Sequence, residues 1–206
     1  TPDGLRQIAQ DLAETSDGKL QFSFFDEKKM SELGMQMFLG VSKGSELPGR
    51  MVFLEYFPEE AKHTVAIVGK GITFDTGGIS LKPGKGMDEM KFDMCGAGAV
   101  LGTMKAIVEL GLPINVISVL AAAENMPDGK AQKPGDIVKA YNGKTVESLN
   151  TDAEGRVVLG DALGKALGAV LGEAHGEALG ELLGKALGEV LGEALGEVLG
   201  EALGKA

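Results

Sequence analysis

The chain has 206 residues, but it contains no tryptophan and only one cysteine, Cys95. A single thiol cannot form a disulfide within the chain, and low cysteine usage is typical of proteins of the reducing cytoplasm. The two histidines, His63 and His175, stand far from Cys95 and from each other in the sequence. Cysteine–histidine catalysis is therefore disfavoured. We expect a cytoplasmic protein with a different chemistry.

Positive charge is scarce as well, because 20 Lys and Arg stand against 30 Asp and Glu, a formal net charge of −10. A surface that neutralises phosphates needs an excess of basic residues, so nucleic acid is not an expected partner. No apolar run approaches the roughly 18–20 residues of a membrane span, and no membrane partner is expected. The first residues include neither an initiator methionine nor an export signal. We expect the sequence to begin inside a longer parent protein.

Composition divides the chain near residue 163. Residues 1–163 are varied in sequence and long enough to bury a core, so we expect them to form one globular unit. Glycine recurs at every fourth position from Gly160 to Gly204, and leucine follows nearly the same rule. Four residues advance about 400° around an α-helix, so the leucine row drifts by about 40° per repeat and faces no single partner. We predict that residues 164–206 are a low-complexity tail without chemistry. A helix that docks on the globular part is the alternative.

Apolar periodicity predicts that helices and strands alternate within the globular unit. Strands separated by helical segments favour an α/β fold, with a mixed, largely parallel sheet flanked by helices. An Asn142-Gly143 turn between two short apolar runs predicts a β-hairpin. Helices are expected at residues 5–13 and 96–110, and strands at residues 20–24, 51–57, 64–68 and 114–120.

The most informative run is residues 150–156, Asn-Thr-Asp-Ala-Glu-Gly-Arg. Asp152 and Glu154 are two positions apart, and in an extended segment such side chains project to the same side. Two carboxylates that reach one point beside Arg156 suit a divalent cation with an anion held next to it. A turn with solvated charges is the simpler interpretation, so the run needs support from elsewhere in the chain.

Four more candidate residues lie upstream. Lys70 and Asp75 belong to a glycine-rich segment after a buried type of strand, and Lys82 follows a few residues later. Asp93 lies among apolar residues shortly before a predicted helix. Taken singly, the lysines would be solvated, Asp75 would be a turn residue and Asp93 a helix N-cap. Loops at strand ends are where α/β sheets assemble their sites, however, so the ordered pattern favours a common site.

These motifs resemble those of the leucyl (cytosol) aminopeptidase family, and the bacterial branch is the most similar. The resemblance covers roughly residues 20–163 with motifs in the family's order. It implies a catalytic domain with a mixed sheet between helices, and a metal-dependent aminopeptidase that removes leucine-like N-terminal residues from peptides. The matching motifs are Lys70-Gly71-x-Thr-Phe-Asp75-x-Gly-Gly, Lys82, Asp93, Glu124-Asn125-Met126-Pro127 and residues 150–156.

The resemblance implies that five of these residues are metal ligands. Asp75 and Glu154 would bridge two divalent ions, manganese or zinc. Lys70 and Asp93 would complete the tighter site, and Asp152 the more exchangeable one. Two dications would balance the four carboxylates, which would otherwise repel and raise one another's pKa. A lysine ligand must be neutral, and a neighbouring dication lowers the pKa of such a group.

Lys82 and Arg156 are the catalytic residues that the resemblance implies. Lys82 would polarise the scissile carbonyl and stabilise the oxyanion, where a fixed positive charge is most effective. Arg156 would hold a bicarbonate that relays a proton from the attacking water. Since a metal would anchor the free amine of the substrate, the expected substrates are peptides with a free N-terminus.

The resemblance ends near residue 163. Family members carry more of the catalytic domain there, which lines the substrate pocket and completes the sheet, and they have a separate N-terminal domain. They are typically hexamers, through regions that this sequence does not match. A site whose support is loose by about 1 Å loses most of its rate. The alternative function is therefore a fragment that binds divalent metal, or merely folds, without turnover.

Overall fold

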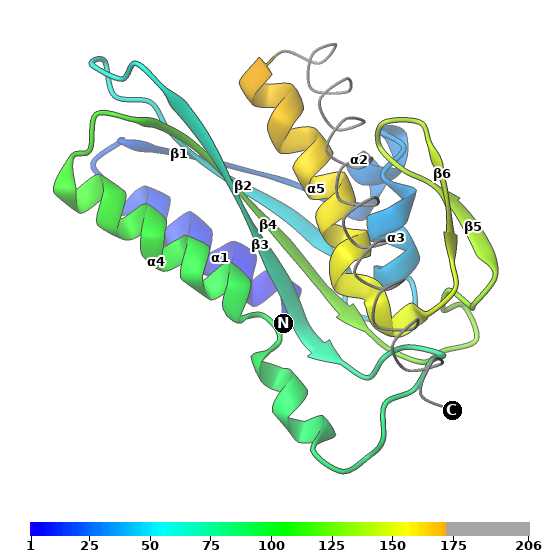
Figure 1. Cartoon of the computed structure of the whole chain (residues 1–206). Helices are drawn as coiled ribbons and strands as arrows, with labels where there is room; N and C mark the ends of the chain where they lie inside the picture. Colours follow the sequence, from blue (N-terminus) through cyan, green and yellow to red (C-terminus); the bar gives the residue numbers. More distant parts are fainter. Residues whose placement is uncertain (172–206) are drawn as a thin grey trace, which may run out of the picture.

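A four-stranded sheet forms the centre of the computed structural model, which describes residues 1–171 (Figure 1). Its order is β1-β2-β4-β3, where β2 is antiparallel to both neighbours and β3 is parallel to β4. The expected α/β fold with a mixed sheet is confirmed, but the parallel share is smaller than expected. Parallel pairing needs a long crossover, and α4 supplies one only between β3 and β4. The strands are β1 (Leu20–Phe25), β2 (Arg50–Tyr56), β3 (Thr64–Asp75) and β4 (Asn115–Asn125).

Helices cover both faces of this sheet (Figure 1). One face carries α1 (Pro2–Glu14) and α4 (Cys95–Leu110). The other carries α2 (Glu27–Glu32), α3 (Gln36–Ser42) and α5 (Glu154–Leu171). The short 3₁₀ helices η1 (Met87–Phe92) and η2 (Thr151–Ala153) lead into α4 and α5. The predicted hairpin is β5 (Asp136–Lys139) and β6 (Thr145–Ser148), a separate antiparallel ribbon.

The sheet separates two apolar cores. On one face, helix α4 packs so closely on β3 that it fixes the position of the residues between η1 and α4. A Cβ on Gly69 of β3 would lie 2.8 Å from the carbonyl oxygen of Gly96 and 2.8 Å from Cα of Ala97. Glycine at position 69 therefore allows the first turn of α4 to rest directly on β3. This contact brings the residues just before α4 next to Lys70, the neighbour of Gly69.

An irregularity in β3 turns its last residue toward α5. Ile72 pairs with Ala123 but Asp75 pairs with Asn125, so three steps along β3 match two steps along β4. Side chains alternate along a regular strand, which would put Lys70 and Asp75, five apart, on opposite faces. The extra residue of this bulge places Asp75 on the same face as Ile72 and Lys70. That face packs against α5.

Helix α5 continues past residue 163, so the start of the predicted tail is helical. Ala162 and Ala166, four residues apart, are buried against the sheet. The division of the chain at residue 163 stays a prediction, and residues 172–206 of the tail lie outside the described residues. None of the helices within residues 1–171 combines the length and the apolar character that crossing a membrane requires.

Candidate metal centre

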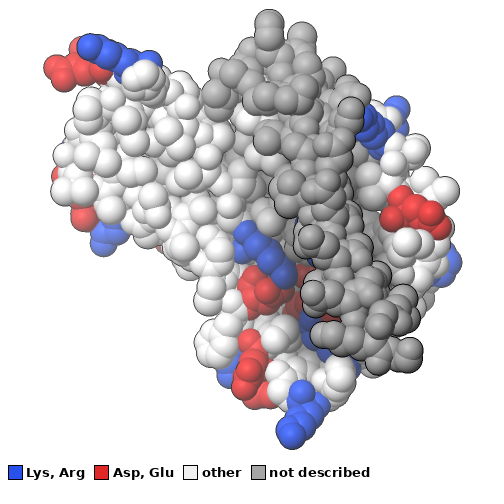
Figure 2. Space-filling view, viewed as in Figure 1, with Lys and Arg blue, Asp and Glu red and all other residues white. Residues whose placement is uncertain are grey.

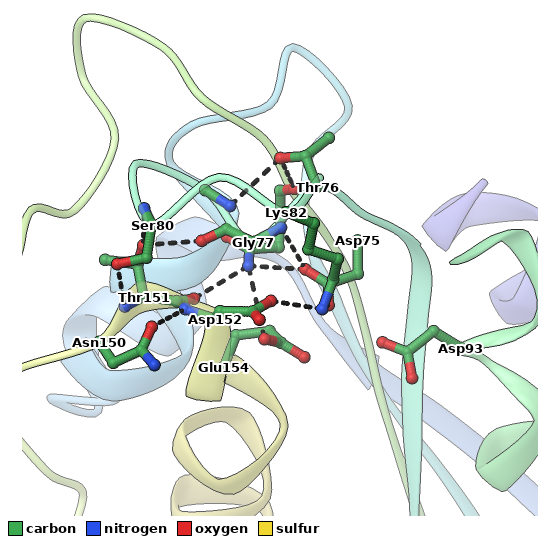
Figure 3. A network of polar contacts seen from close by, with 12 residues as sticks. Asp75, Thr76, Gly77, Ser80, Lys82, Asp93, Asn150, Thr151, Asp152 and Glu154 are labelled. Carbon is green, nitrogen blue, oxygen red and sulfur yellow. Dashed lines mark hydrogen bonds and ion pairs between the residues drawn. The ribbon is translucent and has the colours of Figure 1, made fainter. Parts of the chain in front are cut away.

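Charged side chains from separate segments meet at the carboxyl ends of β3 and β4 (Figure 3). Parallel strands end at the same edge of a sheet, and this is where α/β folds place their sites. Acidic and basic side chains lie together near the middle of the face shown in Figure 2. We call the following six residues the charged cluster: Lys70 and Asp75 of β3, Lys82 of the next loop, Asp93 before α4, Asp152 of η2 and Glu154 of α5.

Lys70 links two of the carboxylates. Its Nζ lies 2.6 Å from Asp93 Oδ2 and 2.6 Å from Glu154 Oε1. Burial of Lys70 lowers its pKa, but the hydrogen bonds and charges of the two carboxylates outweigh burial and raise the pKa. Burial raises the pKa of Glu154, and the bond from Lys70 opposes that rise. Lys70 is therefore not the solvated surface lysine of the simpler interpretation.

Lys82 links the other two carboxylates. Its Nζ lies 2.9 Å from Asp75 Oδ2 and also pairs with Asp152 Oδ1 (Figure 3). Burial lowers the pKa of Lys82, but both carboxylates together raise it above the usual value. Asp75 Oδ1 accepts a hydrogen bond from the backbone N–H of Gly77 at 2.9 Å. Asp75 is thus a turn residue and a member of the charged cluster at once, with one oxygen for each role.

The donor set of the charged cluster fits divalent metal ions. Four carboxylates stand against two ammonium groups, which leaves two negative charges in excess. Asp93 Oδ2 and Asp152 Oδ1 are buried and lack a hydrogen bond of good geometry, although a lysine lies within ion-pair distance of each. One oxygen from each of Asp75, Asp93 and Glu154 lies within 4.8 Å of the others. Hard oxygen donors with excess negative charge are the ligands that manganese prefers.

One local expectation and one simpler interpretation for these acids are wrong. Asp152 lies in a 3₁₀ turn and Glu154 begins α5, so the run is not extended. The side chain of Asn150 accepts a hydrogen bond from the backbone N–H of Asp152 at 2.9 Å and caps this turn, which favours a helical start. Asp93 is not the N-cap of α4, because Met94 occupies that position. Its carboxylate instead turns to Lys70.

The sequence profile of the cytosol aminopeptidase family, catalytic domain, matches residues 1–174. The chain belongs to the cytosol aminopeptidase family. The resemblance carried by the motifs is thereby confirmed. Probable cytosol aminopeptidases of Acinetobacter baumannii and Azotobacter vinelandii are 59% and 58% identical to it over 162 and 163 residues. These matches cover 79% of this chain but 34% and 33% of the relatives, so the chain spans about a third of their length.

A solved structure is also similar to this family member. The bottromycin maturation enzyme BotP in complex with Mn matches with a TM-score of 0.76 and 44% sequence identity. The match covers 81% of this chain and 36% of that chain.

Arg156 is the one predicted site residue of this family member that the structure leaves outside the charged cluster. It is exposed on the first turn of α5 and makes no hydrogen bond or ion pair with residues 1–171. Its role as the bicarbonate-binding residue stays a prediction.

Hydrogen bonds connect the loops of the site. They come from polar residues to which the sequence analysis assigned no role. Thr151 Oγ1 donates a hydrogen bond to the Gly77 carbonyl at 2.7 Å and accepts one from the Ser80 backbone N–H at 2.8 Å (Figure 3). Asn125, the last residue of β4, donates to Asp75 Oδ1 at 2.8 Å. The signal for Asn125 was its place in the Glu124-Asn125-Met126-Pro127 motif, which gave it no role. Thr151 and Ser80 gave none, because small polar residues are common in loops.

Two cavities on the described part of this family member lie away from the charged cluster. Their volumes are about 240 and 210 Å³, and both lie beside α2 and α3. Glu27 and Lys43 line both of them, and no member of the charged cluster lines either. These cavities therefore do not provide a substrate pocket for chemistry at the cluster.

Proposed function

We propose that this chain carries the metal centre of a metal-dependent aminopeptidase that removes leucine-like N-terminal residues from peptides. The observation that carries the proposal is the gathering of four carboxylates with only two lysines, which leaves negative charge for cations to balance. Membership of the cytosol aminopeptidase family and likeness to a structure that contains Mn support it.

Five of the six residues of the charged cluster would hold the metals. Asp75 and Glu154 would contact two ions, Asp93 and Lys70 would complete the tighter site, and Asp152 the more exchangeable one. When bound, two divalent ions, manganese or zinc, supply an activated water and an anchor for the substrate's free amine.

Two further residues would act on the reacting groups. Lys82 stays charged beside Asp75 and Asp152, and a charge held there would stabilise the oxyanion of the scissile carbonyl. Arg156, with its exposed guanidinium on the first turn of α5, would hold a bicarbonate close to the cluster. The proposed substrates are peptides with a free N-terminal amine.

The direct test measures metal and turnover on the same preparation. Native mass spectrometry with added Mn²⁺ or Zn²⁺ counts bound ions, and release of nitroaniline from leucine p-nitroanilide measures hydrolysis. We expect bound metal and metal-dependent hydrolysis, both of which Glu154→Gln abolishes. The matched control is Asp161→Asn, which changes another buried acid of α5 outside the charged cluster. A protein that neither binds metal nor hydrolyses the substrate would contradict the proposal.

A second candidate function is metal binding without turnover. It is favoured by the length of the match, since the chain spans about a third of its relatives, and by cavities that lie away from the charged cluster. In that case native mass spectrometry shows bound metal, while leucine p-nitroanilide stays intact at every metal concentration.

A further inference from the structure

Asn125 contacts each of the segments that supply carboxylates from β3, η2 and α5. Its side chain is buried, and Nδ2 lies 2.8 Å from Asp75 Oδ1 and 3.0 Å from the Thr151 carbonyl oxygen. A third, longer contact of 3.5 Å reaches Glu154 Oε2. The backbone carbonyl of Asn125 accepts hydrogen bonds from the Thr76 N–H at 3.0 Å and from Thr76 Oγ1 at 2.8 Å. One residue therefore connects the loop after β3 to the start of α5.

The chemistry of the amide suits this position. An asparagine NH₂ carries two hydrogens, and the two short contacts, to Asp75 and to Thr151, use both of them. Asp75 Oδ1 also accepts from the backbone N–H of Gly77, so this oxygen is held from two sides. The other oxygen of Asp75, Oδ2, is thereby turned toward Lys82. A buried amide NH₂ with both hydrogens donated holds one orientation.

The backbone around Asn125 is built to fit it closely. A Cβ on Gly78 would lie 2.8 Å from Asn125 Oδ1 and 3.1 Å from Thr151 Oγ1, and Gly78 has a φ of +66°. Glycine is needed there for its backbone conformation and for the room it leaves. The bulge in β3 also places Asp75 directly opposite Asn125. Two independent features, Gly78 and the bulge, thus bring the segments that carry the proposed metal ligands into contact with the side chain of Asn125.

We propose that Asn125 is a positioning residue of the metal centre. Its amide sets which oxygen of Asp75 faces the charged cluster and fixes the distance between Asp75 and the η2–α5 start that carries Asp152 and Glu154. The inference rests on the proposed metal centre and adds to it a residue that would touch neither metal nor substrate. Residues that orient metal ligands are typically worth about 10–100-fold in metal affinity.

Mn²⁺ affinity, measured by titration calorimetry on the full chain, tests the proposal. We expect Asn125→Ala to weaken Mn²⁺ binding by roughly 10–100-fold. The matched control is Asn115→Ala at the other end of β4, where the amide makes a 3.4 Å contact with Thr64 Oγ1 far from the charged cluster along the strand. Asn115→Ala should bind Mn²⁺ as wild type does. A lower melting temperature for Asn125→Ala with unchanged Mn²⁺ affinity would reduce Asn125 to a structural residue and overturn the proposal.

Asn125→Asp separates position from charge. This variant keeps the size of the side chain but replaces the NH₂ donor by an acceptor oxygen that faces Asp75 Oδ1. If Asn125 acts by orienting Asp75, the variant binds Mn²⁺ more weakly than wild type in spite of its added negative charge. Tighter binding would mean that net charge alone governs the site, which contradicts the proposal.

The metal-free wild type gives a readout that does not depend on the proposed function. Both side-chain amide protons of Asn125 should exchange slowly with solvent in NMR spectra, because both are donated to buried acceptors. Fast exchange would overturn the positioning role. Wild-type protein that binds no Mn²⁺ but protects these protons would contradict the metal centre while retaining the role of Asn125 in holding Asp75.

Discussion

Helix α5 buries two carboxylates seven residues apart, and the fold treats them in opposite ways. Glu154 on the first turn is paired with Lys70 at 2.6 Å and belongs to a cluster with negative charge in excess. Asp161, two turns later, accepts backbone N–H bonds from Phe38 at 3.0 Å and from Tyr141 at 2.8 Å. No lysine or arginine pairs with Asp161 within residues 1–171.

The difference separates the acid that we propose as a metal ligand from an acid bound only by the backbone. Burial raises the pKa of both carboxylates, and to about 6 for Asp161. Backbone N–H groups of α3 and of the β5–β6 turn bind both oxygens of Asp161, but burial outweighs these bonds and raises its pKa. Glu154 and the other three carboxylates of the charged cluster share only two lysines, which leaves two negative charges in excess.

Glu154→Gln should weaken Mn²⁺ binding by more than about 100-fold, since even residues that merely orient a ligand are worth about 10–100-fold. Asp161→Asn, the matched change on the same helix, should leave Mn²⁺ affinity unchanged. Titration calorimetry measures both dissociation constants. Equal losses in the two variants would show that α5 as a whole, not its first turn, governs binding.

Asp161→Ala should lower the stability of the fold and leave Mn²⁺ affinity unchanged, the reverse of what we expect for Glu154→Gln. The backbone N–H groups of Phe38 and Tyr141 lose their buried acceptor, at a cost of about 2–4 kcal/mol in the free energy of unfolding. Urea unfolding of the metal-free protein measures this change, with Mn²⁺ affinity as the second readout. The comparison fails if Glu154→Gln lowers the metal-free stability more than Asp161→Ala does.

The pH dependence of stability should carry the signature of Asp161. Its folded pKa of about 6 lies above the ordinary aspartate pKa of 3.8, so protonation favours the folded state. The contribution is fully present below about pH 4 and is lost as pH rises through about 6, a change of about 3 kcal/mol. The unfolding free energy of wild type should therefore fall by about 2–3 kcal/mol relative to that of Asp161→Asn between pH 4 and pH 7. A constant difference over that range would contradict the raised pKa.

Alanine substitutions at two glycines of α5 should give the smallest difference in Mn²⁺ affinity. A Cβ at Gly155 would lie 2.9 Å from Lys70 Cε and 3.0 Å from its Nζ, so Gly155→Ala should move the ammonium away from Asp93 and weaken Mn²⁺ binding roughly 10-fold. A Cβ at Gly160 would meet only the flexible end of Met37, at 2.8 Å. Gly160→Ala should leave Mn²⁺ binding unchanged and gain up to about 1 kcal/mol of helix stability. Calorimetry and thermal unfolding separate the two; identical Mn²⁺ affinities would show that the close contact with Lys70 is unimportant.

Local patterns in the sequence predict most of the elements of this fold. Apolar periodicity locates α1 and α4, and the Asn142-Gly143 turn locates the β5–β6 hairpin, because these depend on neighbouring residues. The strand directions depend on long-range pairing, so the antiparallel pairs of β2 did not follow from the pattern.

The candidate site shows the same division between local and distant information. The motifs name the members of the charged cluster, but the bulge that turns Asp75 toward α5 depends on the register between β3 and β4. The helical start at Asp152 depends on the cap from Asn150, which competes with the extended conformation. Asn125 acts through a hydrogen bond to a residue 50 positions away, and no local pattern encodes such a bond.

Crystals of the wild-type chain grown with Mn²⁺ would test the central assignment most directly, through anomalous scattering of the metal. We expect two anomalous peaks among the carboxylates of Asp75, Asp93, Asp152 and Glu154, with the lysine–carboxylate pairs rearranged to admit them. A map without peaks there, in which Lys70 and Lys82 still hold all four carboxylates at saturating Mn²⁺, would contradict it.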